Sequence, residues 1–131
     1  AAGITVGEAL AASDRLAEDN ILARLIDLYT VKPLDTQTLV EAARATGRVL
    51  TVEDHWPEGG LGEAVFSALA ENDVAVAGTL LAVRHMPDSA TPQQELAEAG
   101  IDSVAIADAA RRLVERRAGS ATAEPVAGKA G

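Results

Sequence analysis

Apolar residues recur three and four positions apart in several stretches of the chain, which is the spacing of helices that bury one face. The clearest stripe is Leu61, Ala64, Val65, Ala68 and Leu69. The pattern predicts a first helix over 5–18 and further helices that start after Asp35, at Leu61, at Pro92 and after Asp102. The helix after Asp35 would bury Leu39, Ala42 and Ala43. The helix after Asp102 would bury Ile106, Ala109, Ala110 and Leu113. Each of these helices needs another element to cover its apolar face.

Residues with helix-capping chemistry mark where these helices begin and end. Asp35 is a natural N-cap, because its side chain can accept a hydrogen bond from the first turn, and Gly47 is expected to end that helix. The run Thr91-Pro92-Gln93-Gln94 has the form of a capping box with proline at the first helical position, and Gly100 stops the short helix that follows. Asp102 is expected to cap the last helix.

Apolar runs between the helices predict strands at 22–28, 49–52 and 79–83. Strands that alternate with helices indicate an α/β fold, in which a mainly parallel sheet is covered by helices on both faces. We expect one such domain over residues 1–118. Residues 119–131 consist largely of Ala, Gly, Ser and Pro without periodicity, which predicts a disordered tail or linker.

The composition excludes several classes of function. The chain has 131 residues, no cysteine and a net charge of -9. A negative charge repels a phosphate backbone, so neither nucleic acid nor an anionic membrane surface is an expected partner. The lack of cysteine excludes disulfides, thiolate metal sites and cysteine nucleophiles. No apolar run approaches the roughly 20 residues that span a bilayer, and the default location is the cytoplasm.

Polar residues and glycines gather where two of the predicted strands end. The carboxyl ends of parallel strands meet at one edge of a sheet, where ligands and partner surfaces usually bind. We therefore expect a strand-end loop or interface site there, and assign no catalytic, cofactor-binding or metal-binding residue. The candidates are Glu53, Asp54, His55, Trp56, Glu58, Gly59, Gly60 and His85.

Two chemical interpretations of these candidates are weaker than a packing role. His55 and His85 could join Glu58 in a metal or proton-transfer site, but they lack metal-ligand spacing, so hydrogen bonding within a loop or across an interface is the simpler role. The run Gly59-Gly60-Leu61-Gly62 resembles a phosphate-cradling loop, but carboxylates surround it, and the glycines are better explained by a tight turn and close packing. Trp56 either covers the end of the core or contacts a partner, since aromatic residues are enriched at interface hot spots.

Four motifs distributed from the start of the chain to its last helix carry a family resemblance. They are Ala2-Gly3, Lys32-Pro33-Leu34-Asp35, Val52-Glu53-Asp54-His55 with Glu58-Gly59-Gly60-Leu61-Gly62-Glu63-Ala64-Val65, and Gly100-Ile101-Asp102. Together they resemble the C-terminal domain of transketolase. The resemblance implies a three-layer α/β/α sandwich on a mainly parallel sheet, and it covers residues 1–117.

The resemblance also implies a division of labour. Complete transketolase transfers two-carbon ketol units between sugar phosphates, and its thiamine diphosphate and divalent metal are bound by two other domains. This chain would be a non-catalytic domain or fragment whose partners are those other domains or subunits, in a homodimer. The equivalent domain of a ketoacid dehydrogenase beta subunit or of deoxyxylulose phosphate synthase is an alternative. A stand-alone α/β module that binds an anion is another.

The chain departs from the family pattern in two places. Pro87-Asp88-Ser89-Ala90-Thr91-Pro92 stands where transketolases generally carry the basic Pro-Arg-Ser-Gly-Lys-Pro, so an anion contact made there in relatives is not expected here. The family also has one or two strands before Ala2-Gly3 that this chain lacks. The strand directly before lies in the family's sheet between the strands that match 22–28 and 49–52.

An empty slot between those two strands would leave backbone groups unpaired in what should be the core. Either the two strands close up and pair directly, or a segment of another chain fills the slot, or the isolated piece is marginally folded. We favour a fragment of a longer protein whose upstream strand belongs in the slot.

Overall fold

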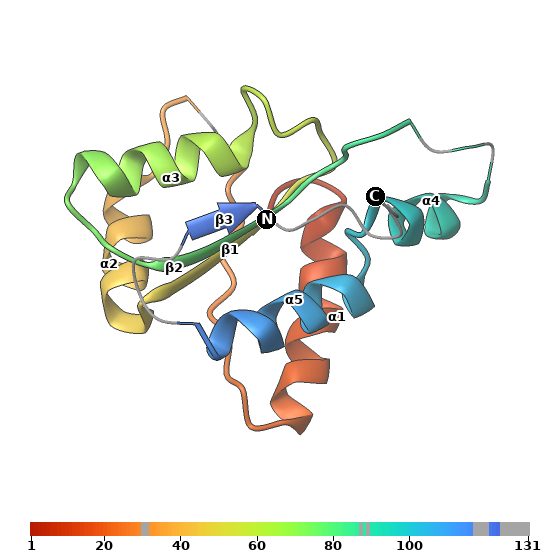
Figure 1. Ribbon diagram of the computed structural model, residues 1–131, viewed down its shortest axis with the longest axis horizontal. Helices are drawn as coiled ribbons and strands as arrows, with labels where there is room; N and C mark the ends of the chain where they lie inside the picture. The colour runs from red at the N-terminus through yellow and green to blue at the C-terminus, as the bar shows by residue number, and fades with distance from the viewer. Residues whose placement is uncertain (30–31, 87, 89, 117–120, 124–131) are drawn as a thin grey trace.

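The computed structural model describes residues 1–29, 32–86, 88, 90–116 and 121–123. The strands form a three-stranded parallel sheet in the order β1-β2-β3, with Arg48 opposite Ala77 and Gly78 opposite Ala121 (Figure 1). The elements in chain order are α1 (Thr5–Glu18), α2 (Thr36–Thr46), β1 (Arg48–Val52), α3 (Leu61–Glu71), β2 (Ala77–Leu81), α4 (Pro92–Ala99), α5 (Ser103–Val114) and β3 (Ala121–Ala123).

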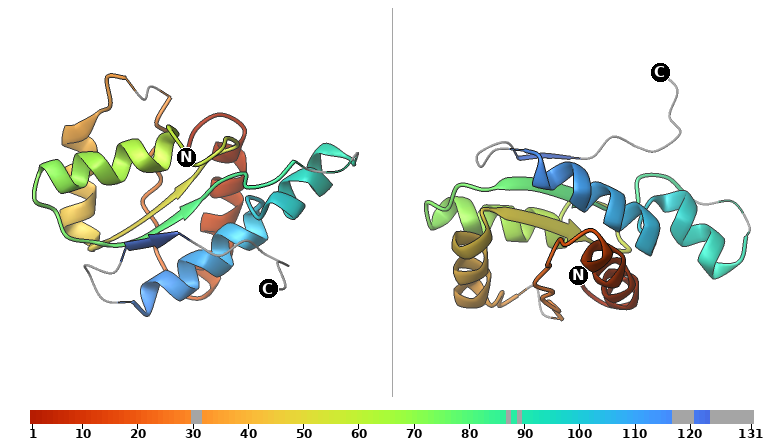
Figure 2. Two further views of the ribbon diagram at one scale, coloured as in Figure 1. Left: turned by 45° about the horizontal axis from the view of Figure 1, so that its top comes forward. Right: turned by 90° about the horizontal axis from the view of Figure 1, so that it is seen from below.

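Helices cover both faces of the sheet, as the sequence predicted. Successive side chains of a strand point to opposite faces. Leu50 and Val52 of β1 therefore pack into one apolar cluster with α1 and α5, while Val49 packs into a second cluster with α2 and α3. Figure 1 shows the strands between these two pairs of helices, and Figure 2 shows β1, β2 and β3 side by side. The α/β/α layering is thus confirmed.

The predicted helix boundaries are confirmed by the caps. The carboxylates of Asp35 and Asp102 each accept a hydrogen bond from the backbone N–H three residues further on, at 3.2 and 2.9 Å. Thr91 forms the complete capping box that the sequence indicates. Gly47 and Gly100 end their helices at φ of 67° and 72°, a left-handed conformation that glycine adopts without strain.

The prediction of a strand at 22–28 is wrong, because this extended segment belongs to no sheet among the described residues. A strand needs a paired neighbour, and here a single residue provides one. The Ala1 amine donates to the Ile26 carbonyl at 3.1 Å, and the Leu28 N–H donates to the Ala1 carbonyl at 2.8 Å. These two bonds are the pattern of a parallel pair between Ala1 and Asp27. Beyond that pair, no strand among the described residues lies beside the segment.

A groove of about 450 Å³ separates this segment from β1. Its walls include Leu16 of α1, Leu25, Leu50, Val65 of α3 and Leu113 of α5. Of the three alternatives, direct pairing of the two strands is therefore not observed. The slot that the family resemblance implies is present as an apolar groove.

Two smaller differences concern the rest of the sheet. β2 begins and ends two residues earlier than the predicted strand at 79–83. It ends earlier because the Val83 N–H donates to the His55 carbonyl, which lies in a loop rather than in a strand. Within the predicted tail, residues 121–123 form β3, and its other residues lie outside the described residues, so the division of the chain at 118 stays a prediction. No described helix is long and apolar enough to cross a membrane.

Candidate functional site at the carboxyl edge of the sheet

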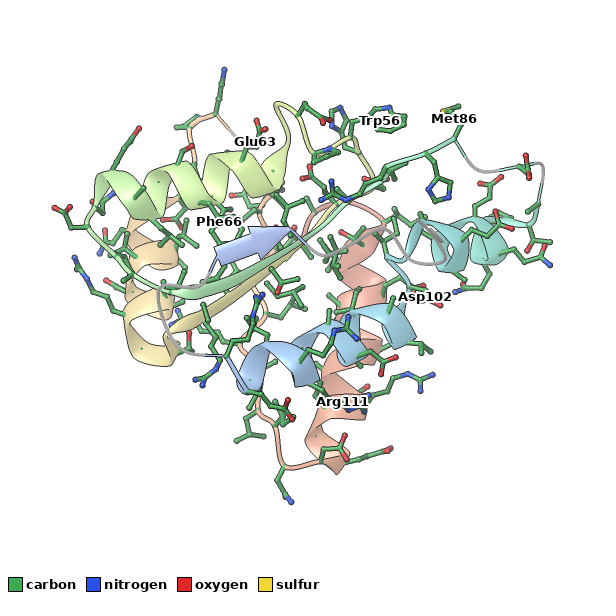
Figure 3. All side chains as sticks on the ribbon, viewed as in Figure 1. Trp56, Glu63, Phe66, Met86, Asp102 and Arg111 are labelled. Carbon is green, nitrogen blue, oxygen red and sulfur yellow. The ribbon has the colours of Figure 1, made fainter. Side chains whose placement is uncertain are left out.

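The structure brings the predicted site residues together where β1 and β2 end. The Glu53 N–H donates to the Leu81 carbonyl at 3.0 Å, and the Val83 N–H donates to the His55 carbonyl at 3.0 Å, so the two loops are joined to each other. In Figure 3 the labelled Trp56 lies on the outer side of this edge. Asp54, His55, Glu58, Gly59 and His85 are exposed, Trp56 is 42% exposed, and Glu53 and Gly60 are buried.

Glu53 caps the start of α3 from the end of the neighbouring strand. Its carboxylate is buried and accepts hydrogen bonds from the N–H groups of Leu61 at 2.7 Å and Gly62 at 3.1 Å. A helix N-terminus carries free N–H groups and a partial positive charge, which is what an anionic ligand would bind. Here the protein's own carboxylate takes that position, so the loop is a closed structural turn rather than an anion cradle.

The glycines around this cap allow close packing. A Cβ at Gly60 would overlap the carboxylate of Glu53, and a Cβ at Gly62 would overlap the Leu80 side chain of β2. Gly59 has φ of 70°, and its N–H donates to the Glu63 carboxylate at 2.7 Å. These positions therefore need glycine for the turn and for the contact between α3 and the sheet.

The histidines do not form a metal site with the acidic residues. His55 Nδ1 lies 2.7 Å from the carbonyl oxygen of Trp56, a hydrogen bond within the loop. Among the described residues, no group of three or more His, Cys, Asp or Glu side chains is placed to hold a metal ion. The loop hydrogen bond is the simpler role that the sequence favoured for His55.

Sequence reasoning missed two features of this edge. It counted Glu53 among the carboxylates that would repel an anion, but not as the cap of α3. The signal was present, because an acidic residue at a strand end is followed by Gly-Gly and a helix start. It also missed Arg84 and Met86 beyond β2, of which Met86 is 77% exposed. Nothing in the hydrophobic pattern marked either residue.

The N-terminal residues pack against the same edge. The hydroxyl of Thr5 is buried and contacts the carbonyls of Ala2 at 2.6 Å and Val52 at 3.1 Å, which ties the start of α1 to the end of β1. Burial lowers the pKa of the Ala1 amine below 8.0, although the nearby Asp27 and Glu53 carboxylates act in the opposite direction.

These features define an α/β/α sandwich domain whose helix terminus at the strand edge is closed by its own carboxylate. The family model of the transketolase C-terminal domain matches residues 1–106. Transketolase of Homo sapiens is 47% identical over 116 residues, which are 88% of this chain and 18% of that protein. Transketolase-like protein 1 of Bos taurus is 50% identical over 115 residues, which are 86% of this chain and 19% of that protein.

A solved structure agrees with these relatives. A split gene transketolase, described as an inactive beta4 tetramer, is similar with a TM-score of 0.80 and 34% sequence identity, over 86% of this chain and 37% of that chain. The chain belongs to the transketolase C-terminal domain family, and it spans 18% of the length of the human relative. The predicted family and fold class are confirmed.

Proposed function

We propose that this chain is the C-terminal, non-catalytic domain of a transketolase that transfers two-carbon ketol units between sugar phosphates. The observation that carries the proposal is the family match over residues 1–106, together with 47% identity to human transketolase. The domain helps to build the subunit and to assemble a homodimer in the cytoplasm. Catalysis belongs to the larger part of the enzyme, which this chain does not span.

Thiamine diphosphate and a divalent metal would be bound by the other domains. The residues described here do not fit either group. They place no cluster of His, Cys, Asp or Glu side chains for a metal ion, and Glu53 occupies the N–H groups of Leu61 and Gly62 that a diphosphate would need. In this proposal the chain therefore contributes no residue to the binding of either group.

Activity measurements test this division of labour. The purified 131-residue chain is mixed with thiamine diphosphate, a divalent metal, a ketose phosphate and an aldose phosphate. The longer polypeptide encoded by the parent gene serves as the positive control. We expect ketol transfer by the longer polypeptide and none by the chain alone, provided that circular dichroism shows the chain to be folded. Robust transfer by the chain, free of contaminating enzyme, would refute the proposal.

The alternatives are separated by two further observations. Isothermal titration with phosphate, a nucleotide or thiamine diphosphate should give no saturable binding at micromolar concentration, because the Glu53 carboxylate blocks the helix terminus. Binding would favour an anion-binding module. The gene sequence upstream of Ala1 distinguishes transketolase from a ketoacid dehydrogenase beta subunit or deoxyxylulose phosphate synthase. We expect it to encode the pyrimidine-binding domain of a transketolase.

A further inference from the structure

The loops beyond β1 and β2 present apolar side chains to solvent. Trp56 is 42% exposed and Met86 is 77% exposed, and the two loops are held together by the bond from the Val83 N–H to the His55 carbonyl. Figure 3 shows Trp56 and Met86 on the same side of the molecule. Tryptophan is strongly enriched at the centres of protein interfaces, and flexible methionine adapts to the shape of a partner. We call these two residues with Arg84 the Trp56–Met86 surface.

Arg84, two residues before Met86 in the loop beyond β2, has a side-chain nitrogen without a hydrogen-bond partner among the described residues. Its terminal nitrogen Nη2 is buried, and among the described residues no atom accepts a hydrogen bond from it. A buried donor without an acceptor is unfavourable, and the side chain of an arginine is long enough to turn toward an oxygen that a partner supplies. The two loops therefore combine two exposed apolar side chains with an arginine whose Nη2 has no acceptor among the described residues.

We propose that the Trp56–Met86 surface docks against the remaining part of a transketolase subunit, which supplies an apolar pocket for Trp56 and Met86 and a carboxylate or carbonyl oxygen for Arg84. This inference rests on the proposed function, because the chain spans 18% of the human relative and leaves most of such an enzyme available as the partner. Exposed Asp54 and Glu58 flank the surface, so the facing rim of the partner carries Lys or Arg.

Two other occupants fit this surface less well. A second copy of the chain would bring two molecules of charge -9 together with the same acidic rim on both sides. A small anionic ligand would meet those carboxylates and a helix terminus that Glu53 already occupies. The rest of the subunit requires neither like-charge contact nor a vacant helix terminus.

Hydroxyl-radical footprinting of the isolated chain and of the longer polypeptide from the parent gene tests the docking. We expect labelling of Trp56 and Met86 to fall about tenfold in the longer polypeptide, since buried interface side chains exclude solvent. Leu10 of α1, which is 55% exposed and lies outside this surface, is the control and should change little. Unchanged labelling of Trp56 and Met86 in a longer polypeptide that is active in ketol transfer would overturn the inference and leave the proposed function intact.

Two further measurements keep the assignment of the partner and of Arg84 falsifiable. Trp56 is the single tryptophan, so its emission in the isolated chain should stay red-shifted at all concentrations. A blue shift that grows with concentration would identify a second copy as the occupant instead. The variant Arg84→Met should leave the melting temperature of the isolated chain unchanged or higher, yet raise labelling of Trp56 in the longer polypeptide at least threefold. An equal loss of stability in both proteins would show that Arg84 has an internal structural role.

Discussion

A strand inserted in the groove beside β1 should stabilise this domain, and the hydrogen bonds of Ala1 define where such a strand runs. Ala1 already pairs with Asp27 in the parallel sense. The polypeptide directly before Ala1 would therefore run parallel to the 22–28 segment, in the groove between that segment and β1. The perturbation is to extend the 131-residue chain by the six residues that would precede Ala1 in the proposed parent transketolase.

The edge of β1 that faces the groove has backbone N–H and C=O groups that could pair with this strand. The Ala77 N–H bonds to the Gly47 carbonyl and the Glu53 N–H bonds to the Leu81 carbonyl, so the odd-numbered residues of this stretch face β2. By alternation, the N–H and C=O of Leu50 point the other way, toward the groove. An incoming strand thus finds backbone partners on both of its sides and apolar walls above and below.

The magnitude follows from the size of the slot. A five-residue strand would add about eight backbone hydrogen bonds at about 1 kcal/mol net each. It would bury about four apolar side chains at about 2 kcal/mol each. Ordering five residues costs about 2 to 3 kcal/mol each for backbone and side chains. The net gain is on the order of 3 kcal/mol, which corresponds to a rise of about 10 °C in melting temperature for a domain of this size.

Differential scanning calorimetry of three proteins checks this reasoning. The extended chain is compared with the 131-residue chain and with a control extended by a Gly/Ser segment of the same length, which should change little because it buries no apolar side chain. A second control has proline in the middle of the native extension and should lose most of the gain. If the 131-residue chain already melts cooperatively as a highly stable monomer and the native extension changes nothing, the placement of the strand is wrong.

Three further predictions concern named residues, each measured by denaturant unfolding. Glu53→Ala should lower the free energy of unfolding by about 3 to 5 kcal/mol, because two buried N–H groups lose a charged acceptor. The control Glu63→Ala removes one exposed acceptor and should lower it much less. Equal effects would contradict the capping role of Glu53. Gly62→Ala should lower the free energy of unfolding by about 1 to 3 kcal/mol, because the new Cβ would overlap the Leu80 side chain of β2. The control Gly7→Ala lies in α1 with open space around it and should raise the free energy of unfolding by about 0.5 to 1 kcal/mol. A tolerated Gly62→Ala would count against the close packing of α3 on the sheet. Burial lowers the pKa of the Ala1 amine below 8.0, so between that lowered pKa and 8.0 the unfolded chain binds more protons than the folded chain. The free energy of unfolding of a polypeptide that begins at Ala1 should therefore rise with pH through this window, and N-terminal acetylation should remove this pH dependence. A flat profile before acetylation would rule out the burial effect.

The helices of this domain could be predicted from capping residues close to each helix start. The strand prediction at 22–28 failed because strand formation depends on pairing with a distant segment. Asp35, Thr91 and Asp102 each fix a helix start through hydrogen bonds within a few residues, so the sequence contains all the information needed. The 22–28 segment has the apolar composition of a strand, but strand formation depends on a neighbour that the pattern of one segment does not reveal. For β2, the weak strand former Gly78 lies inside the strand because it is paired on both sides.

At the candidate site too, the sequence predicted some features, and others depended on the three-dimensional arrangement. The sequence predicted that the loop residues from Glu53 to Gly60 and His85 would meet at one edge, because parallel strands place their carboxyl ends together. It did not predict the bond between the Glu53 carboxylate and α3, which requires the strand and the helix to be positioned in three dimensions. The role of Trp56 as an interface residue stays a prediction.

The Glu53 cap has a consequence for how this domain could acquire a new activity. The helix terminus, the glycine turn and the two backbone N–H groups are the parts from which many α/β proteins build a phosphate site. One internal carboxylate is what keeps them occupied. Shortening that single side chain would free the N–H groups of Leu61 and Gly62, and the space above Gly60 would open with them. The backbone geometry of an oxyanion pocket is thus one substitution away, but the exposed carboxylates of Asp54, Glu58 and Glu63 around the turn would still repel an anion. Loss of the cap and this acidic rim together oppose ligand binding at this edge.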